Sequence, residues 1–300
     1  MTMPITLDAA PARCLSLRQG PHQLVLAPAA GGRILRWTSL LEDGPRDWLT
    51  PITASAWPAP EWPKGGLFPL IPFSNRIRQA RMRWDGRDIA IQPLPGQAHA
   101  LHGQAQRMTW EVLRQQAGQV ALGLRHPAGD DGWPWAWSAR QTIRLSADGR
   151  LDIRLSLRNQ DTRPMPAGLG LHPYFTADRV QAHARTDWAH EQELARFPRP
   201  NTCAQWRRDD GTWTVYLSDW DGQAHIHWPS GPGLRMRAHG ALRHLVLHCN
   251  AGRYLCVEPA THVCDAVNLA AAGVPGTGLH SLAPGATLSV GITLTIEKAS

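Results

Sequence analysis

Alternation of apolar and polar residues with a period of two is the feature that most constrains the fold of this chain. In the segment Leu151–Arg158 every odd position is apolar and every even position is polar, and Thr287–Ile296 alternates in the same way. Shorter segments repeat the pattern at Val120–Leu124, Trp213–Leu217 and Leu234–Met236. Successive side chains of a β-strand point to opposite faces, so these segments are predicted to be strands with one buried face.

Glycine and proline separate these segments. The 27 glycines and 25 prolines disfavour long helices, and only Trp188–Phe197 suits a short one. Many short strands joined by Gly/Pro turns predict an all-β protein, a large antiparallel sandwich or a barrel. Without a repeat, a low-complexity linker or a break in composition, we expect a single domain over residues 1–300. The Pro/Trp-rich segment from Trp57 to Pro63 reads as an irregular loop at the mouth of a site.

Cysteine usage and hydropathy point to the cytoplasm. The five cysteines are an odd number, are widely spread and form no CxxC pair, which is typical of reduced thiols. We see no apolar run long enough to span a bilayer and no secretory signal. A cytoplasmic protein with no membrane partner is therefore expected.

The net charge of +7 comes almost entirely from arginine. Such a surplus could indicate an anionic partner. The densest basic stretch, Arg76–Arg83, is interrupted by apolar residues, which suits a strand and turn with one solvated face. No helix-turn-helix, zinc-finger or RNP pattern accompanies it, so a nucleic-acid partner is not expected.

Two polar pairs are candidates for ligand binding. Asn75 and Arg76 end an otherwise apolar segment, Phe68–Ile77, and offer amide and guanidinium donors, although a surface polar pair would look the same. His99 and His102 stand three residues apart. They could be metal ligands, but no third ligand is evident, and a hydrogen-bonded histidine in a turn is the more common arrangement.

A histidine and a glutamate are the candidates for proton transfer. His172 is held extended by the following proline, and Gly168 and Gly170 before it permit close approach of backbone or ligand. Alternation places Cys256 and Glu258 on one face of a largely apolar strand, which Pro259 is expected to end. Glu258 is thus either a solvated strand end or a base in a pocket.

Together these segments resemble the aldose 1-epimerase family, which has the galactose mutarotase-like fold. The resemblance runs through FPLIPFSNRI, HALHG, MPAGLGLHPYF, SDWDG, HIHWP and CVEPATHVCDAVNL, in the family's order, over residues 20 to 297. It implies a large antiparallel β supersandwich and interconversion of the α and β anomers of a hexose.

The resemblance also implies roles for particular residues. Glu258 matches the general base and His172 the general acid, while Asn75, Arg76 and His102 match positions that hold sugar hydroxyls. Tyr174 follows the acid as in the family and is expected to shape the pocket. A small sugar is the implied partner, and the reaction requires no metal or other cofactor.

The sequence departs from the family in two places. Near Leu245–His248 it lacks the polar amide of some mutarotases, and it also differs at one sugar-binding position. An ungapped alignment places Thr214 where an aspartate often grips sugar hydroxyls, and Asp219 and Asp221 lie in a segment that is a turn in the family. These departures leave the substrate open. A phosphorylated or otherwise modified sugar, or a non-catalytic sugar-binding protein on the same scaffold, are the alternatives to a mutarotase acting on free hexoses.

Overall fold

The protein is described by a computed structural model that covers residues 14–52, 63–129, 132–208 and 211–297. The loop expected at Trp57–Pro63 lies outside these residues except for Pro63. Most of the described chain is extended, and the one α-helix within it, α1, is short (Ala266–Ala271). In the described residues no helix combines the length and the apolar character that crossing a bilayer requires.

The strands of the first half of the chain are β1 (Leu15–Gln19), β2 (His22–Ala27), β3 (Arg33–Leu41), β4 (Gly44–Asp47), β5 (Leu67–Leu70), β6 (Arg76–Ile77), β7 (Arg81–Trp84), β8 (Arg87–Ala90), β9 (Ala100–Leu101), β10 (Glu111–Gln116), β11 (Gln119–His126), β12 (Trp137–Leu145) and β13 (Leu151–Asn159). Single turns of 3-10 helix lie at Arg78–Ala80 and Ala105–Arg107.

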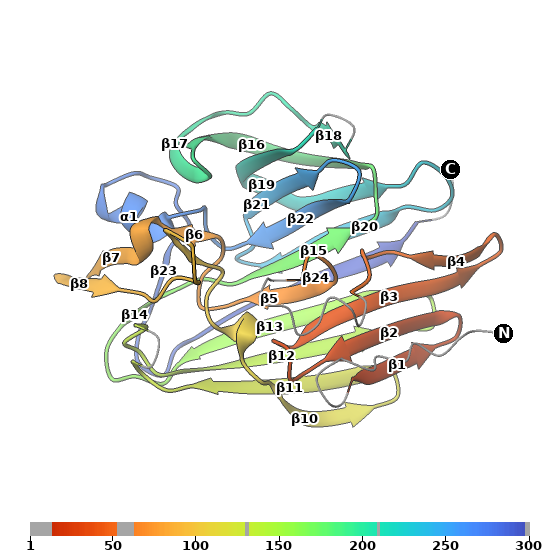
Figure 1. Ribbon diagram of the computed structural model, residues 1–300, viewed down its shortest axis with the longest axis horizontal. Coiled ribbons are helices and arrows are strands. Elements are labelled where there is room, and N and C mark those ends of the chain that lie inside the picture. The colour runs from red at the N-terminus through yellow and green to blue at the C-terminus, as the bar shows by residue number, and fades with distance from the viewer. Residues whose placement is uncertain (1–13, 53–62, 130–131, 209–210, 298–300) are drawn as a thin grey trace.

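The second half contributes β14 (Met165–Ala167), β15 (Gly170–Phe175), β16 (Arg179–Glu191), β17 (Leu194–Pro200), β18 (Gln205–Arg207), β19 (Trp213–His227), β20 (Leu234–Gly240), β21 (His244–Asn250), β22 (Tyr254–Ala260), β23 (His280–Leu282) and β24 (Thr287–Ile296). Figure 1 shows how these strands run across the molecule.

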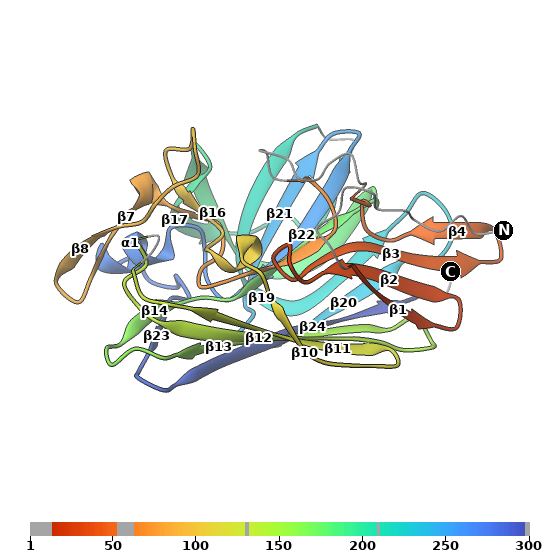
Figure 2. The same cartoon turned by 60° about the horizontal axis from the view of Figure 1, so that its bottom comes forward.

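Antiparallel pairing joins strands from nearly the whole chain. It runs from β10 through β11, β12, β13, β24 and β20 to β19. From β19 it continues through β21, β22, β15, β5, β3 and β2 to β1. The first group of strands forms one layer and the second lies over it (Figure 2). The predicted large antiparallel β supersandwich is therefore confirmed.

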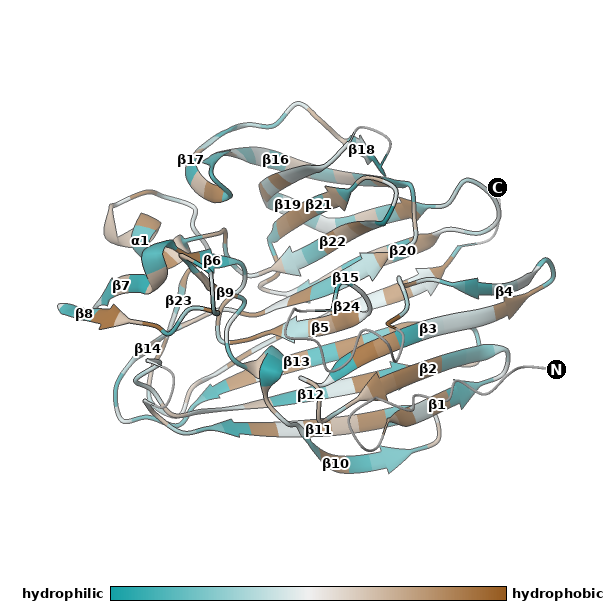
Figure 3. Ribbon diagram, in the orientation of Figure 1, coloured by the Kyte–Doolittle hydropathy of each residue, from teal (hydrophilic) through white to brown (hydrophobic). Residues whose placement is uncertain are grey.

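The period-two segments are the strands that separate the core from solvent. Along β13 the odd positions are buried and the even ones are not, and its partner β12 repeats the alternation. Figure 3 shows it as bands of hydrophobic and hydrophilic residues along the strands. Burial of the apolar face of each strand is what holds the two layers together. Trp133, Trp135 and Trp137 are all buried in this core.

The helix expected at Trp188–Phe197 is wrong. This segment is the hairpin of β16 and β17, with Gln192 and Glu193 at positive φ in the turn. Long-range pairing decides the outcome, because β16 also pairs with β19 (Asp187 opposite Leu217) and buries Trp188. A weak local preference for helix yields to such tertiary contacts.

Candidate functional site

Two rows of side chains cross neighbouring strands and form the candidate site. Phe68 of β5 pairs with His172 of β15. Because Tyr174 of β15 lies opposite Cys256 of β22, the same register brings His172 opposite Glu258. Two residues along, the second row runs from Tyr174 through Cys256 and His248 to Thr214. His172 and Glu258 lie in motifs about 85 residues apart in the sequence. Strand pairing in the sheet makes their side chains neighbours.

His172 and Glu258 are in direct contact and almost fully buried. The imidazole Nε2 lies 3.3 Å from the carboxylate Oε1, and the two residues are 5% and 2% exposed. Among the described residues neither His172 Nδ1 nor Glu258 Oε2 has a hydrogen-bond partner. Buried polar atoms are normally paired, so these two atoms are candidates to meet a ligand. The solvated strand end considered for Glu258 is excluded, and β22 continues through Pro259 to Ala260 rather than ending there.

Aromatic rings fix the orientation of the imidazole. Phe68 and Tyr174 lie nearly parallel to the His172 ring, with centroids 4.8 and 4.5 Å away. The guanidinium of buried Arg33 lies 4.0 Å from the Phe68 ring centroid and donates hydrogen bonds to the backbone oxygens of Pro63 and Gly65. Stacking thus orients the His172 ring, in place of a hydrogen bond to Nδ1.

Burial keeps this pair uncharged. It raises the pKa of Glu258 to about 8, and the charges of Arg76 and Lys64 only partly oppose it. Burial also holds the pKa of His172 well below its usual value, with a further contribution from His102. Near neutral pH the pair therefore carries one proton that the two groups share.

Asn75 and His102 form a reciprocal hydrogen-bonded unit beside the pair. The backbone N–H of Asn75 donates to His102 Nδ1 at 3.1 Å, and the backbone N–H of His102 donates to the Asn75 carbonyl at 2.8 Å. Both residues have positive φ. Gly103 is required next to them, because a Cβ there would lie 2.1 Å from the Ile71 carbonyl oxygen.

This unit presents two hydrogen-bond donors. With Nδ1 of His102 accepting a bond, the proton of the neutral ring is on Nε2. The amide oxygen of Asn75 accepts from the Arg76 N–H, which leaves its amino group as the donor. The His102 ring packs edge-on against His172 with centroids 5.1 Å apart. The pair of donors therefore flanks the His172–Glu258 contact.

His262 anchors the loop that carries Asn75 through the preceding residue, Ser74. Its Nε2 accepts the backbone N–H of Ser74 at 3.1 Å, and its Nδ1 donates to the Val263 carbonyl at 2.8 Å. Burial lowers the pKa of His262 to about 4, which keeps the ring neutral and both bonds intact. A Cβ at Gly168 would lie 2.1 Å from this ring, which explains the glycine two residues before Gly170.

Arg76 and Tyr174 take different places around the pair. The Arg76 guanidinium forms an ion pair with Glu193 at 2.5 Å, in the β16–β17 turn, and its charge still acts on Glu258 and His102. Tyr174 stacks on His172 and packs edge-on against Tyr254. The expected site residues thus lie around one centre, with Arg76 already engaged by a carboxylate.

The SDWDG segment is a distortion within β19 rather than a turn. Asp219 and Gly222 have positive φ, but the strand continues past them. Asp219 accepts a hydrogen bond from Thr186 and Asp221 accepts one from the Gln223 N–H. Thr214, on the site face, has its hydroxyl 2.9 Å from His248 Nδ1. Neither aspartate therefore substitutes for a carboxylate at position 214.

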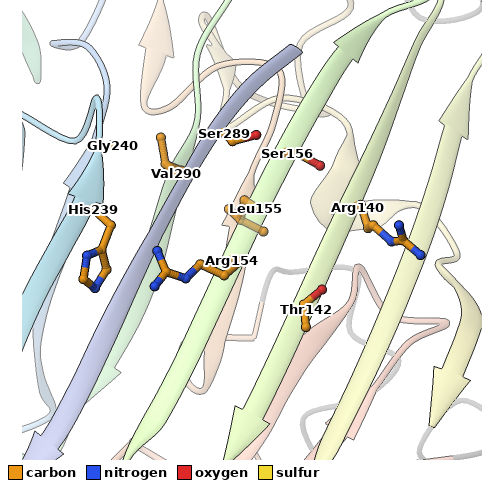
Figure 4. Close-up of a pocket in the computed structure, with 9 residues that line it drawn as sticks. All are labelled: Arg140, Thr142, Arg154, Leu155, Ser156, His239, Gly240, Ser289 and Val290. Carbon is orange, nitrogen blue, oxygen red and sulfur yellow. The ribbon is translucent and has the colours of Figure 1, made fainter.

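Other features singled out in the sequence lie apart from this centre. His99 Nδ1 accepts a hydrogen bond from the Gln79 N–H, and among the described residues neither His99 nor His102 belongs to a group of three possible metal ligands. His225 contacts Glu297 at 3.2 Å on the surface. A pocket over β12, β13, β24 and β20, whose lining includes Arg140 of β12 and Arg154 of β13, shares no residue with the site (Figure 4).

Several site residues could not have been found from the sequence alone. Arg33 and Glu193 lie in segments whose local pattern does not distinguish them, and only long-range pairing brings them to the centre. His262 does lie in the motif CVEPATHVCDAVNL but was not singled out there. Phe68 and Cys256 do lie in the motifs and on the correct strand faces. Alternation of side chains between the two faces of each strand was the signal from which they could have been predicted.

The antiparallel supersandwich is a galactose mutarotase-like fold, and its buried His–Glu pair lies on two paired strands of the sheet, β15 and β22. The chain belongs to the aldose 1-epimerase family, whose family model matches residues 13–295.

Known relatives match different shares of the chain, all at low sequence identity. The uncharacterized protein YphB of Escherichia coli is 28% identical over 255 residues, or 77% of this chain and 83% of that protein. The aldose 1-epimerase of Escherichia coli is 30% identical over 116 residues, 38% of this chain and 33% of that enzyme. A crystal structure from the same species, provisionally assigned as an aldose 1-epimerase, has a TM-score of 0.81 at 26% identity and covers 95% of this chain and 99% of its own.

The fold extends to a more distant structure. The GalM/aldose epimerase homologue of C. elegans superimposes with a TM-score of 0.79 at 18% identity, covering 96% of this chain and 99% of its own. At that identity the likeness concerns the fold alone.

Proposed function

We propose that this protein is an aldose 1-epimerase that interconverts the α and β anomers of a hexose, with Glu258 and His172 as the proton-transfer pair. The observation that carries the proposal is the buried contact between these two groups, each with one unpaired polar atom. Membership of the family supports the reaction type.

The reaction needs one proton acceptor and one proton donor at the same time. Opening the hemiacetal ring removes a proton from the C1 hydroxyl and delivers another to the ring oxygen. Once the shared proton has passed from Glu258 to His172, Glu258 as carboxylate takes the first and His172 as imidazolium gives the second; after rotation about C1–C2 the two exchange roles and the ring closes. Positioned proton transfer of this kind contributes about 10²–10⁴-fold in rate.

One shared proton suits a reaction that runs in both directions. A buried pair that holds a single proton can pass it between carboxylate and imidazole without importing charge from solvent. Within the proposal, His102 Nε2–H and the Asn75 amino group donate to sugar hydroxyls, and Arg76 supports the ionised form of Glu258. Tyr174 shapes the site by holding the imidazole ring.

Polarimetry on freshly dissolved α-D-glucose and α-D-galactose tests the proposal. Glu258→Gln and His172→Asn keep the size of each side chain but remove its proton chemistry, so mutarotation should fall by about two orders of magnitude or more in each. His225 and Glu297 provide a matched control, because they form a His–Glu contact of similar length at the surface. His225→Asn and Glu297→Gln should retain full activity. Near-normal turnover in either site variant would contradict the assignment.

A phosphorylated hexose is the second candidate substrate, and the observation that favours it is the positive field at His102. Burial is the main cause of the lowered pKa of this histidine, and the charges of Arg76, Lys64, Arg107 and Arg33 lower it further. A panel that includes glucose 6-phosphate separates the two substrates. Sugar binding without any acceleration of mutarotation would instead indicate a binding protein on this scaffold.

A further inference from the structure

Three donor atoms of different chemistry converge at the candidate site. The imidazole of His172, the thiol of Cys256 and the carboxylate of Glu258 each contribute one atom, and all three atoms lie within 4.8 Å of one another. All three side chains are buried, and Cys256 is a free thiol. Glu258 accounts for the proton chemistry with His172, but the proposed reaction gives the thiol no role.

We propose that this triad is a site for zinc, or for the similar cadmium ion, and that the metal acts there as an inhibitor rather than as a cofactor. Sulfur, nitrogen and oxygen donors from three side chains, with a fourth position open, are the kind of set that binds zinc in proteins. Inhibition by the metal rests on the proposed function, because the metal would occupy both proton-transfer groups. Binding of the metal does not depend on the proposed function.

The existing separations are close to those of a zinc site. Ligand atoms about 2.0–2.3 Å from a tetrahedral zinc lie roughly 3.3–3.8 Å from each other. His172 Nε2 and Glu258 Oε1 are already 3.3 Å apart. The widest separation in the triad, at most 4.8 Å, has to close by about 1.3 Å, which rotation of the Cys256 and Glu258 side chains can supply.

The surroundings argue against a dedicated metal cofactor. A histidine that serves a resident zinc normally donates its other ring N–H to a carboxylate or carbonyl. Here His172 Nδ1 has no such partner among the described residues, and its ring is held by stacking instead. Cations also surround the triad, since Lys64 and Arg76 act on Glu258. We therefore expect reversible binding rather than a permanent metal centre.

The direct test is titration of Zn²⁺ into the metal-free full-length protein by calorimetry. One equivalent should bind. Cd²⁺ should produce a thiolate-to-metal charge-transfer band in the ultraviolet, which reports sulfur ligation independently of any activity. Zn²⁺ should also stop mutarotation, and a chelator should restore it.

Variants locate the site. Cys256→Ser should weaken Zn²⁺ binding at least tenfold and abolish the Cd²⁺ band, and Cys256→Ala serves in its place if serine impairs folding. Glu258→Gln should weaken binding as well. Cys203→Ser, at an exposed cysteine, and His227→Ala, beside the surface His225–Glu297 contact, should leave binding unchanged.

The outcomes that overturn the proposal are distinct from failure of the proposed function. Absence of stoichiometric Zn²⁺ binding, binding unaffected by Cys256→Ser and Cys256→Ala, or loss of binding in His227→Ala would each overturn it. So would full mutarotation by the zinc-loaded protein. A protein that binds Zn²⁺ through Cys256 but never accelerates mutarotation would refute the proposed function alone.

Discussion

At the scale of single residues, burial of Glu258 has a consequence that is separate from activity. A carboxyl group whose pKa is raised on folding binds its proton more tightly in the folded state than in the unfolded one. It therefore contributes most to stability below the ordinary pKa, 4.5, and this contribution is lost as the pH rises towards the folded value of about 8. At neutral pH most of this contribution is already lost, because the carboxyl ionises in the unfolded state while burial keeps it protonated in the folded one.

Glu258→Gln should remove that loss. The variant should be more stable than the wild type by a few kcal/mol at pH 8, because each unit of pKa shift is equivalent to about 1.4 kcal/mol. The difference should shrink as the pH falls and disappear below about pH 4. Urea unfolding at several pH values measures it, with Glu297→Gln as the exposed control. A difference independent of pH would show that Glu258 is not the buried, uncharged carboxyl that we describe.

Single residues also show how much of the candidate site the sequence motifs can predict. The structure brings His172, Glu258, Asn75 and His102 into one cluster, and each of them lies in a motif that carries the family resemblance. Their protonation states could not be predicted, since these depend on burial by residues from other strands. The partner of Arg76, Glu193, was equally out of reach: it lies in a hairpin turn where a helix had been expected.

At the scale of elements, the alternating segments predicted their strands, whereas pairing decided the rest. The segments at Leu151–Arg158 and Thr287–Ile296 are β13 and β24, and they pair with each other. Pattern alone does not report which strands become neighbours. Helix α1 was missed for a related reason: at six residues it is too short to show a helical period.

Strand β19 carries the prediction for the missing aspartate. Thr214 faces the site in the row that also holds His248 and Cys256, so the ungapped alignment gives it a plausible position. Thr214→Asp should lower KM for glucose and galactose by about tenfold and change kcat little, because a charged hydrogen bond contributes roughly 1.5–3 kcal/mol and His248 will take part of it.

The control for this substitution is Thr214→Val. It keeps the shape and removes the hydroxyl that contacts His248, so KM should not improve. Steady-state polarimetry on both sugars gives the comparison. If Thr214→Asp leaves KM unchanged or raises it in a correctly folded protein, another residue binds the sugar hydroxyl that the family's aspartate binds, and the alignment of β19 is wrong.

At the scale of the whole molecule, pairing unites strands from Leu15 to Ile296 in one continuous sheet. This agrees with one domain, which stays a prediction. The net charge of +7 is a property of the same scale, and it bears on the substrate. Surface charge changes the rate at which charged ligands arrive and leaves neutral ligands unaffected.

Salt dependence of kcat/KM therefore separates the candidate substrates. For neutral glucose or galactose, raising NaCl from about 20 to about 300 mM should change kcat/KM less than twofold. Glucose 6-phosphate, if turned over, should lose efficiency severalfold over the same range, because the Debye length shrinks to less than about 10 Å above 0.1 M salt and screens its attraction to the cations near His102. Lys64→Gln should reduce this sensitivity, while Arg125→Gln, at an exposed arginine of the other layer, should not.

Glucose 6-phosphate turnover that exceeds that of free hexoses and falls with salt would make the phosphorylated sugar the substrate. Equal salt dependence for both sugars would show that the cations act on the protein and not on the ligand.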